Sequence, residues 1–329
     1  MGAPGVATAS AMREPVGVAY RDRLPQLSGE RPFLTDGGLE TSLIFHEGLD
    51  LPSFAAFPLA GDDAGRDALV RYFEPFLAIP REEGVGFVLD TPTWRASPDW
   101  GAELGYSREA LAEANRACVA LAERIAASAN GGPIVISGVV GPRGDGYVPG
   151  ELMSAAEAER YHAEQIGTFA DTAIDMICGI TMTYADEAVG IVRAAAGAGI
   201  PVVISFTVET DGRLPSGQAL GEAIEQVDAE TDGEAAYFMI NCAHPTHFAG
   251  ALEAGGRWLS RIGGIRANAS AKSHAELDEA DALDDGDPVE LGAQYASFRS
   301  LLPEIRVLGG CCGTDQRHVA EISQAWEVG

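Results

Sequence analysis

Eight short apolar runs divide the chain into repeating units, and this repetition is the strongest constraint on its fold. Each run ends near Gly, Pro, Asp or Thr, and an Ala- and Glu-rich segment with helical spacing follows it. Runs that are apolar on both faces are typical of a parallel sheet that helices cover on each side. The runs are residues 32–36, 86–90, 134–140, 174–181, 201–207, 236–242, 261–267 and 306–311.

The number and spacing of these units predict a single-domain (β/α)8 TIM barrel over residues 31–329. An open doubly wound sheet is the alternative. Its dinucleotide-binding version is weakened because no G-x-G-x-x-G follows the first run. Residues 1–30 lack the basic and apolar regions of a secretory signal, so we expect a flexible or partly ordered N-terminal extension.

Helix signals support the same organisation. Ser154 is a good N-cap for a helix over residues 155–174, with Glu157 as its capping-box partner. A second helix over residues 186–198 is expected to end at Gly199. A third, over residues 107–129, contains Cys118, which we interpret as a small buried hydrophobic residue.

Composition excludes several classes of partner. The formal net charge is −27, which argues against binding to nucleic acid or to an anionic membrane. The 5 cysteines are odd in number and irregularly spaced, so a reducing compartment, the cytoplasm, is expected rather than a disulfide scaffold. These features favour small-molecule partners and leave the choice between monomer and homodimer open.

Three cysteines stand at the ends of two predicted strands. Cys242 follows the sixth run, and the adjacent Cys311 and Cys312 follow the eighth. The carboxyl ends of barrel strands share one face, which carries the chemistry in such folds. Three thiolates make a zinc site with one coordination position free, as in catalytic rather than structural sites. The sequence therefore predicts Zn²⁺ held by these three residues.

The adjacent cysteines also allow other interpretations. In an extended strand they would point to opposite faces, so both reach one metal only if the backbone leaves the strand. The neighbouring Gly309, Gly310 and Gly313 permit that departure. A Cys311–Cys312 vicinal disulfide and two unconnected buried thiols are the alternatives.

Two histidines follow Cys242 in C-x-H-x-x-H spacing. We expect His244 and His247 to have a loop role rather than to bind metal, because Pro245 should break any helix that aligned their rings.

The strand-end motifs resemble the homocysteine S-methyltransferase family, which includes S-methylmethionine- and betaine-dependent enzymes. The resemblance is carried by Asp36-Gly37-Gly38, by Asn241-Cys242 and by the Gly-Gly-Cys-Cys-Gly run at 309–313. It extends from about Arg31 to the end of the chain. It implies zinc on the three cysteines with the substrate thiol as fourth ligand. It also implies that Asp36 holds the substrate's amino end beside Gly37. Thr91, Trp94 and Asn241, at neighbouring strand ends, complete the expected substrate site.

One position departs from the family pattern. Strand four of the family normally ends in Glu-Thr, and that glutamate binds the amino group of homocysteine. Here Ile180 stands in its place. An isoleucine cannot pair with an ammonium, so a different thiol or sulfur compound is the alternative acceptor. Cys178, just before it, is expected in the barrel core.

The methyl donor is expected to be a small sulfonium or ammonium compound. The chain has no cobalamin or folate module, and it lacks the C-terminal extension of the betaine enzymes, which favours the sulfonium. Trp94 and Trp100 offer aromatic faces for such a cation. The predicted function is a zinc-dependent S-methyltransferase that converts homocysteine to methionine, in methionine biosynthesis. The rival from another class is a non-catalytic thiol-binding or redox-sensing barrel with the Cys311–Cys312 disulfide.

Overall fold

Eight parallel strands close into a barrel in the computed structural model, which describes residues 19–328. Each strand pairs with its sequence neighbours, and β1 closes the barrel by pairing with β8, with Phe33 opposite Val307. The predicted (β/α)8 barrel is confirmed. The strands are β1 Phe33–Leu34, β2 Phe87–Asp90, β3 Ile134–Val140, β4 Met176–Met182, β5 Val202–Phe206, β6 Ala235–Asn241, β7 Ile262–Ala267 and β8 Val307–Gly310.

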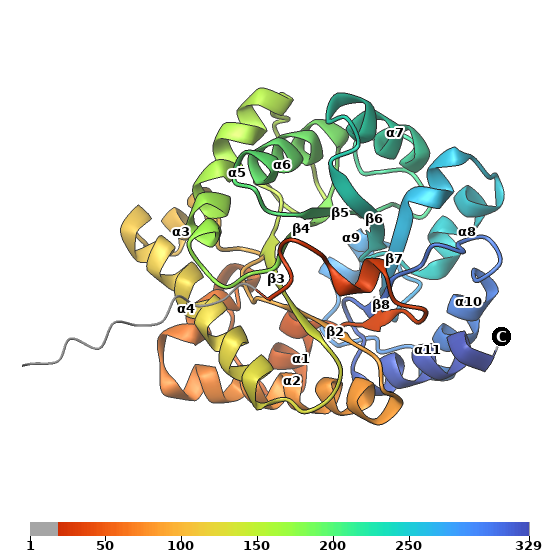
Figure 1. Ribbon diagram of the computed structural model, residues 1–329, viewed down its shortest axis with the longest axis horizontal. Coiled ribbons are helices and arrows are strands. Elements are labelled where there is room, and N and C mark those ends of the chain that lie inside the picture. The colour runs from red at the N-terminus through yellow and green to blue at the C-terminus, as the bar shows by residue number, and fades with distance from the viewer. Residues whose placement is uncertain (1–18, 329) are drawn as a thin grey trace, which may run out of the picture.

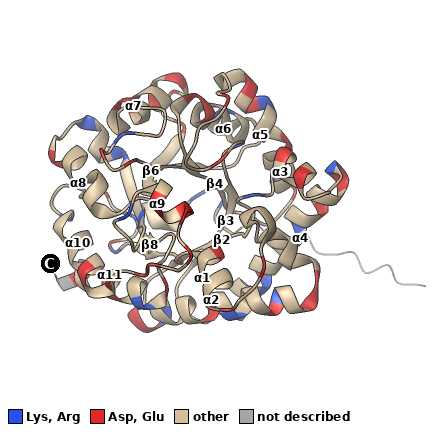
Figure 2. Ribbon diagram, turned by 180° about the vertical axis from the view of Figure 1, so that it is seen from behind, with Lys and Arg blue, Asp and Glu red and all other residues tan. Residues whose placement is uncertain are grey.

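Helices surround the barrel, as Figures 1 and 2 show from opposite ends. Ser154 and Glu157 form the predicted capping box at the start of α5, which ends four residues earlier than expected, at Ala170. The helices are α1 Leu39–Phe45, α2 Asp63–Glu83, α3 Pro98–Glu103, α4 Arg108–Ser128, α5 Ala155–Ala170, α6 Ala185–Gly197, α7 Leu220–Glu230, α8 Pro245–Glu253, α9 His274–Asp278, α10 Pro288–Ser297 and α11 Gln316–Val328. Short 3-10 helices occupy Pro25–Leu27, Pro52–Phe54, Phe57–Gly61 and Arg257–Arg261.

The apolar core has two main layers. One lies between the strands and the outer helices, and the other fills the barrel interior with side chains such as Val135, Val203 and Met239. Cys178 belongs to the interior layer, and Cys118, on α4, is buried in a separate cluster with Phe57 and Leu111. Cys178 was predicted in the barrel core and Cys118 as a small buried hydrophobic residue, and both predictions are confirmed.

The described part of the N-terminal segment closes the amino end of the barrel. Figure 1 shows it, in red, lying across the strands. Gln26 is fully buried and contacts Met176 and Tyr237, and the backbone N–H of Tyr20 donates to Asp175 Oδ1 at 2.7 Å. The part of the expected 1–30 extension that the structure describes is thus packed against the barrel; residues 1–18 lie outside the described residues. With this end filled, a ligand has access from the carboxyl end.

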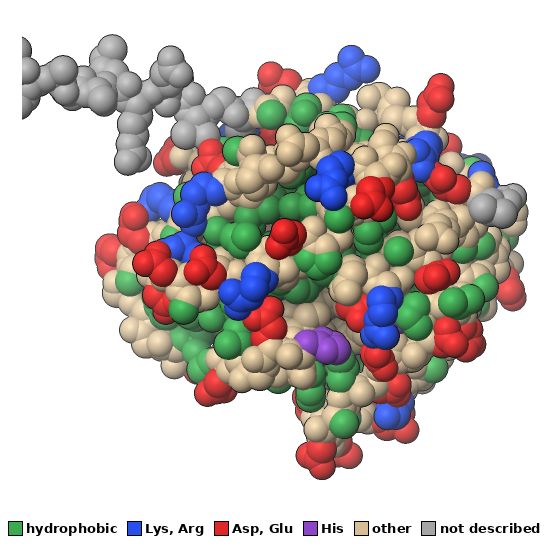
Figure 3. Space-filling view, turned by 90° about the horizontal axis from the view of Figure 1, so that it is seen from below, with side chains coloured by type: hydrophobic (Ala, Val, Ile, Leu, Met, Phe, Trp, Pro, Cys, Tyr) green, Lys and Arg blue, Asp and Glu red, His purple; other side chains and the backbone are tan. Residues whose placement is uncertain are grey.

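Acidic residues are spread over the outer helices and loops rather than gathered at one place (Figure 2). On the face in Figure 3 they alternate with Lys and Arg, which form no continuous patch among the described residues there. None of the helices within residues 19–328 combines the length and the apolar character that crossing a bilayer requires.

Candidate active site

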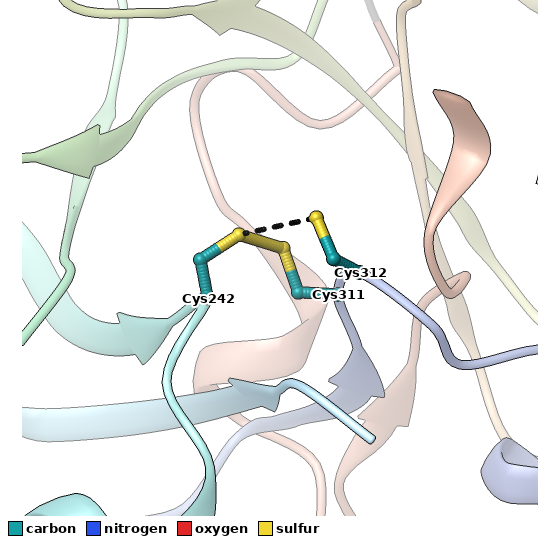
Figure 4. A group of neighbouring side chains, drawn as sticks. All are labelled: Cys242, Cys311 and Cys312. Atoms are coloured by element: carbon teal, nitrogen blue, oxygen red, sulfur yellow. Dashed lines mark hydrogen bonds between the residues drawn. A yellow bond between two sulfur atoms is a disulfide. The ribbon is translucent and has the colours of Figure 1, made fainter. Parts of the chain in front are cut away.

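The three predicted thiols meet at the carboxyl end of the barrel. Cys242 directly follows β6, Cys311 and Cys312 directly follow β8, and their sulfur atoms all lie within 4.8 Å of one another. Figure 4 shows the three side chains turned toward one point. Cys242 Sγ lies 3.9 Å from Cys312 Sγ. The structure thus brings together residues 69 positions apart in sequence.

Cys242 and Cys311 are joined by a disulfide, with their Cα atoms 5.4 Å apart. The alternative of a Cys311–Cys312 vicinal disulfide is therefore wrong: Cys312 is a free thiol. The neighbouring strand end presents Cys242 to Cys311, while the chain turns after Cys311 and directs Cys312 to another side of the cluster.

Glycines near the cysteines act differently from expectation. Gly309 and Gly310 are still part of β8, and a Cβ on Gly310 would overlap the side chain of Thr314. Of the three glycines around the cysteine pair, only Gly313 has a left-handed backbone, with φ +80°. Gly37 has a related role, because a Cβ there would lie 2.5 Å from the carbonyl oxygen of Thr314. These glycines let the loops after β1 and β8 approach each other closely.

A buried ion-pair network lies beneath the thiols. Arg266 of β7 bonds to Asp90 and, at 2.5 Å, to Asp36 Oδ1, while Tyr72 donates to Asp36 Oδ2 at 3.0 Å. Burial raises the pKa of Asp36 to about 6, although Arg266 opposes this shift. Burial alone would lower the pKa of Arg266, but the two aspartates raise it above its ordinary range. We did not predict Arg266; a charged residue inside an otherwise apolar strand was the available signal.

A cavity of about 80 Å³ opens above this network, beside the thiols. Of the predicted substrate residues, Asp36, Gly37, Thr91 and Trp94 line it, as do all three cysteines. Ile180 also lines it and is 7% exposed. Both carboxylate oxygens of Asp36 already bind protein groups, so Asp36 supports the cavity wall as well as facing the cavity.

Asn241, the remaining predicted substrate residue, lies behind the cavity wall. It is fully buried and is not among the side chains that line the cavity. Its Oδ1 accepts from Thr181 N at 3.0 Å and from Ser205 Oγ at 2.7 Å, and its Nδ2 donates to Thr181 Oγ1 at 2.8 Å. Thr181 has φ +63°, a conformation that is costly for a β-branched residue. Asn241 therefore holds Thr181 in place.

A larger chamber of about 520 Å³ adjoins the first and shares Phe54, Trp94, Tyr147 and Cys312 with it. The Arg95 guanidinium lies between two aromatic rings, 4.1 Å from the centroid of Trp94 and 3.8 Å from that of Trp100. One face of each ring therefore already holds a cation from the chain itself. The expectation that both rings present free faces to a donor needs this correction.

Two further side chains, both missed by the sequence analysis, border the thiols. Tyr147 Oη lies 3.7 Å from Cys312 Sγ, and its ring stacks on His274 with centroids 4.1 Å apart. His274 Nε2 donates to the carbonyl oxygen of Cys242 at 2.6 Å. Burial raises the pKa of Tyr147 well above its ordinary value, so the phenol stays protonated beside the sulfur.

The two histidines after Cys242 do not join the cluster. His244 caps α8 by accepting from Thr246 N, and His247 Nε2 donates to the carbonyl oxygen of Ala271 at 3.0 Å. Pro245 does not break a helix as expected; it begins α8, because proline is well tolerated at the first helical position.

The thiol cluster fits a metal ion in its reduced form. A tetrahedral zinc with Zn–S bonds of about 2.3 Å places its sulfur ligands about 3.8 Å apart, close to the 3.9 Å between Cys242 and Cys312. Three soft thiolates are also a ligand set that zinc prefers. The disulfide occupies two of the three sulfurs, so reduction must precede metal binding.

Together, these features define a TIM-barrel enzyme whose site chemistry centres on sulfur. The sequence model of the family described as homocysteine S-methyltransferase matches residues 33–326, and the chain belongs to this family. It is therefore a methyltransferase of this type. A comparison with curated proteins gives no match.

Solved structures of the homocysteine methyltransferase MmuM from Escherichia coli share the fold. The oxidized form has a TM-score of 0.72 and 17% identity, and covers 91% of this chain and 98% of its own. The metallated form has a TM-score of 0.67, with the same identity and coverage. At this level of identity the likeness supports the fold alone.

Proposed function

We propose that the protein is a zinc-dependent S-methyltransferase that moves a methyl group from a small sulfonium compound to a thiol, with homocysteine as acceptor and methionine as product. The observation that carries the proposal is the convergence of Cys242, Cys311 and Cys312 on one point beside a cavity. A thiol is mostly protonated at neutral pH, whereas the thiolate is the nucleophile.

Cys242, Cys311 and Cys312 would hold the zinc, which when bound keeps a coordinated substrate thiol deprotonated. The chain's own residues bind and orient. Asn241 holds Thr181 in the cavity wall, and the network of Arg266, Asp36 and Asp90 supports the cavity floor. Because the site needs reduced thiols, we propose that the enzyme works in a reducing compartment such as the cytoplasm.

The two chambers suggest separate places for the two substrates. The acceptor would occupy the inner cavity beside the thiols, and the donor would occupy the outer chamber, which reaches Cys312 past Trp94 and Tyr147. In the reaction, a lone pair of the acceptor thiolate forms the new S–CH₃ bond. The bond from that methyl to the sulfonium sulfur breaks, and its electron pair leaves with a neutral thioether. Holding both reactants in adjoining chambers supplies the alignment that this displacement needs.

Donor recognition would rest on charge and aromatic edges. Four acidic side chains, Glu103, Asp145, Asp278 and Asp284, line the outer chamber with Phe54, and Lys272 pairs with Asp284 at 3.2 Å. Arg95 is paired with Asp145 at 3.5 Å, so its charge is partly balanced. A small cation therefore fits this chamber better than an anion does.

A second candidate is the same reaction with a different thiol. Ile180 contributes an apolar surface to the inner cavity where the family resemblance predicts a glutamate. Losing one charged hydrogen bond costs roughly 1.5–3 kcal/mol of binding, which is enough to change the preferred acceptor. The non-catalytic redox barrel is not retained, because the chain belongs to a family of methyltransferases.

The test uses the reduced, zinc-supplied protein, S-methylmethionine as donor and a panel of thiols, with methylated products measured by mass spectrometry. We expect methionine from homocysteine. Cys312→Ser should lose activity, whereas Cys118→Ala should retain it, because Cys118 is a buried free cysteine that lines neither chamber. Methylation of other thiols without any methionine supports the second candidate; no methylated thiol at all overturns the proposal.

A further inference from the structure

Glu40 is a carboxylate in the wall of the inner cavity that the family resemblance does not assign. It is the second residue of α1, which begins after the N-cap Gly38. Gly38 packs directly on the cysteine pair, since a Cβ there would lie 3.1 Å from Cys312 Cα. The start of α1 therefore brings Glu40 to the same cavity as the thiols.

The cavity holds three carboxylates, and they differ in their partners. Asp36 and Asp90 both bind Arg266. Glu40 has no ion-pair partner within residues 19–328, and the group that donates toward its carboxylate is its own backbone N–H. The nearby Arg95 is engaged by Asp145. One guanidinium thus balances two aspartates, while Glu40 has no counter-ion of its own among the described residues.

An unpaired carboxylate in such a place is costly unless a ligand supplies its partner. Ile180, Val139 and Phe54 give the cavity apolar walls, and a charge next to apolar walls loses hydration without gaining hydrogen bonds. Consistent with this, burial raises the pKa of Glu40 to about 7, and Asp36 adds to the rise. A ligand cation beside Glu40 would favour its charged form again.

We propose that Glu40 binds the ammonium group of the acceptor, so that the enzyme selects thiols carrying an amino group near the sulfur. This inference rests on the proposed function. Glu40 is a substrate-binding residue here, on α1 rather than on β4, and it supplies the carboxylate that Ile180 lacks. The sulfur of the acceptor would face the cysteines while its ammonium faces Glu40.

The test compares two thiols of equal length, homocysteine and its analogue without the amino group, 4-mercaptobutyrate. Both are given to the reduced, zinc-supplied wild type and to Glu40→Gln, which keeps the shape of the side chain and removes its charge. We expect kcat/KM for homocysteine to fall about tenfold or more, the loss of one charged hydrogen bond. The value for 4-mercaptobutyrate should stay within about twofold. The matched control is Glu47→Gln, just after α1, whose partner is the surface residue Arg71.

Binding measured by calorimetry, without the donor, separates this inference from the proposed function. If no methyl transfer occurs but the wild type binds homocysteine more tightly than 4-mercaptobutyrate, and Glu40→Gln removes that difference, the inference holds while the proposed function fails. Equal binding of the two thiols by the wild type, including no binding of either, overturns it. So does a Glu40→Gln effect confined to the KM of the methyl donor, which would assign Glu40 to the donor instead.

Discussion

Arg266 on β7 donates to Asp36, two residues after β1, at 2.5 Å, and this ion pair joins two strand ends that are 230 positions apart in sequence. Arg266 also bonds to Asp90 and donates from Nε to the carbonyl oxygen of Gly310 at 3.1 Å. One side chain therefore links the ends of β1, β2, β7 and β8 directly below the thiol cluster. The shape of the cavity floor depends on it.

Replacing Arg266 by methionine should destabilise the fold strongly. The variant leaves two buried aspartates without their counter-charge, and breaking a buried pair in this way costs about 3–5 kcal/mol. Urea unfolding measures the change in the free energy of unfolding. Arg193→Met is the control, because the side chains of Arg193 and its partner Glu230 are both exposed, and exposed pairs contribute about 1 kcal/mol or less. A similar loss in both variants would contradict this role of Arg266.

Metal binding should depend on the redox state. With the Cys242–Cys311 disulfide intact, the denatured protein should show 3 reactive thiols, Cys118, Cys178 and Cys312, and all 5 cysteines after reduction. We expect about one zinc per chain in the reduced protein and none in the oxidised protein, because only thiolates bind the metal. Thiol titration and elemental analysis check both states. Zinc retained by a protein with 3 reactive thiols would refute the assignment of ligands.

Asn241→Ala should weaken both the fold and the cavity wall. The substitution leaves Thr181 N and Ser205 Oγ without their acceptor, and an unsatisfied buried polar group costs about 1–3 kcal/mol. Thr181, which lines the cavity, would also lose its anchor. The free energy of unfolding and kcat/KM should fall together, whereas the exposed Asn130→Ala should change stability by less than about 0.5 kcal/mol. An Asn241→Ala protein of normal stability would argue that Asn241 contacts substrate instead.

Selection for the amino thiol should strengthen as pH rises. Burial raises the pKa of Glu40 to about 7, so its carboxyl is largely neutral below this pH and charged above it. Only the charged form attracts an ammonium. We expect the ratio of kcat/KM for homocysteine over 4-mercaptobutyrate to increase between about pH 6 and 8, and taking a ratio cancels the ionisation of the thiol itself. In Glu40→Gln the ratio should stay flat; a wild-type slope that persists in the variant would exclude Glu40 as its source.

Much of the barrel could be predicted from local sequence. The eight apolar runs coincide with the strands to within a few residues, because a strand buried on both faces must be apolar along its length. The sequence also predicted that Cys242 lies near Cys311 and Cys312, because the carboxyl ends of parallel barrel strands share one face.

Side-chain direction at the strand ends could not be predicted in the same way. Asn241, the last residue of β6, turns into the protein, whereas Ile180, two residues before the end of β4, lines the cavity. Thr181 and Cys242 have φ of +63° and +51°, and such conformations persist only where surrounding contacts hold them. Side chains alternate between the two faces of a strand, but this alternation does not predict their direction at the last residues, where the candidate site lies.

The sequence by itself determined the barrel, the face that carries the site and the three sulfur atoms at its centre. These follow from periodicity and from parallel strand order, which are properties of neighbouring residues. Only the tertiary structure decided that Arg266 balances Asp36 and Asp90, that Arg95 lies between Trp94 and Trp100, and that Glu40 has no ion-pair partner among residues 19–328. Charged side chains from distant segments pair through space. Which carboxylate remains without an ion-pair partner therefore depends on all the other ion pairs in the cavity.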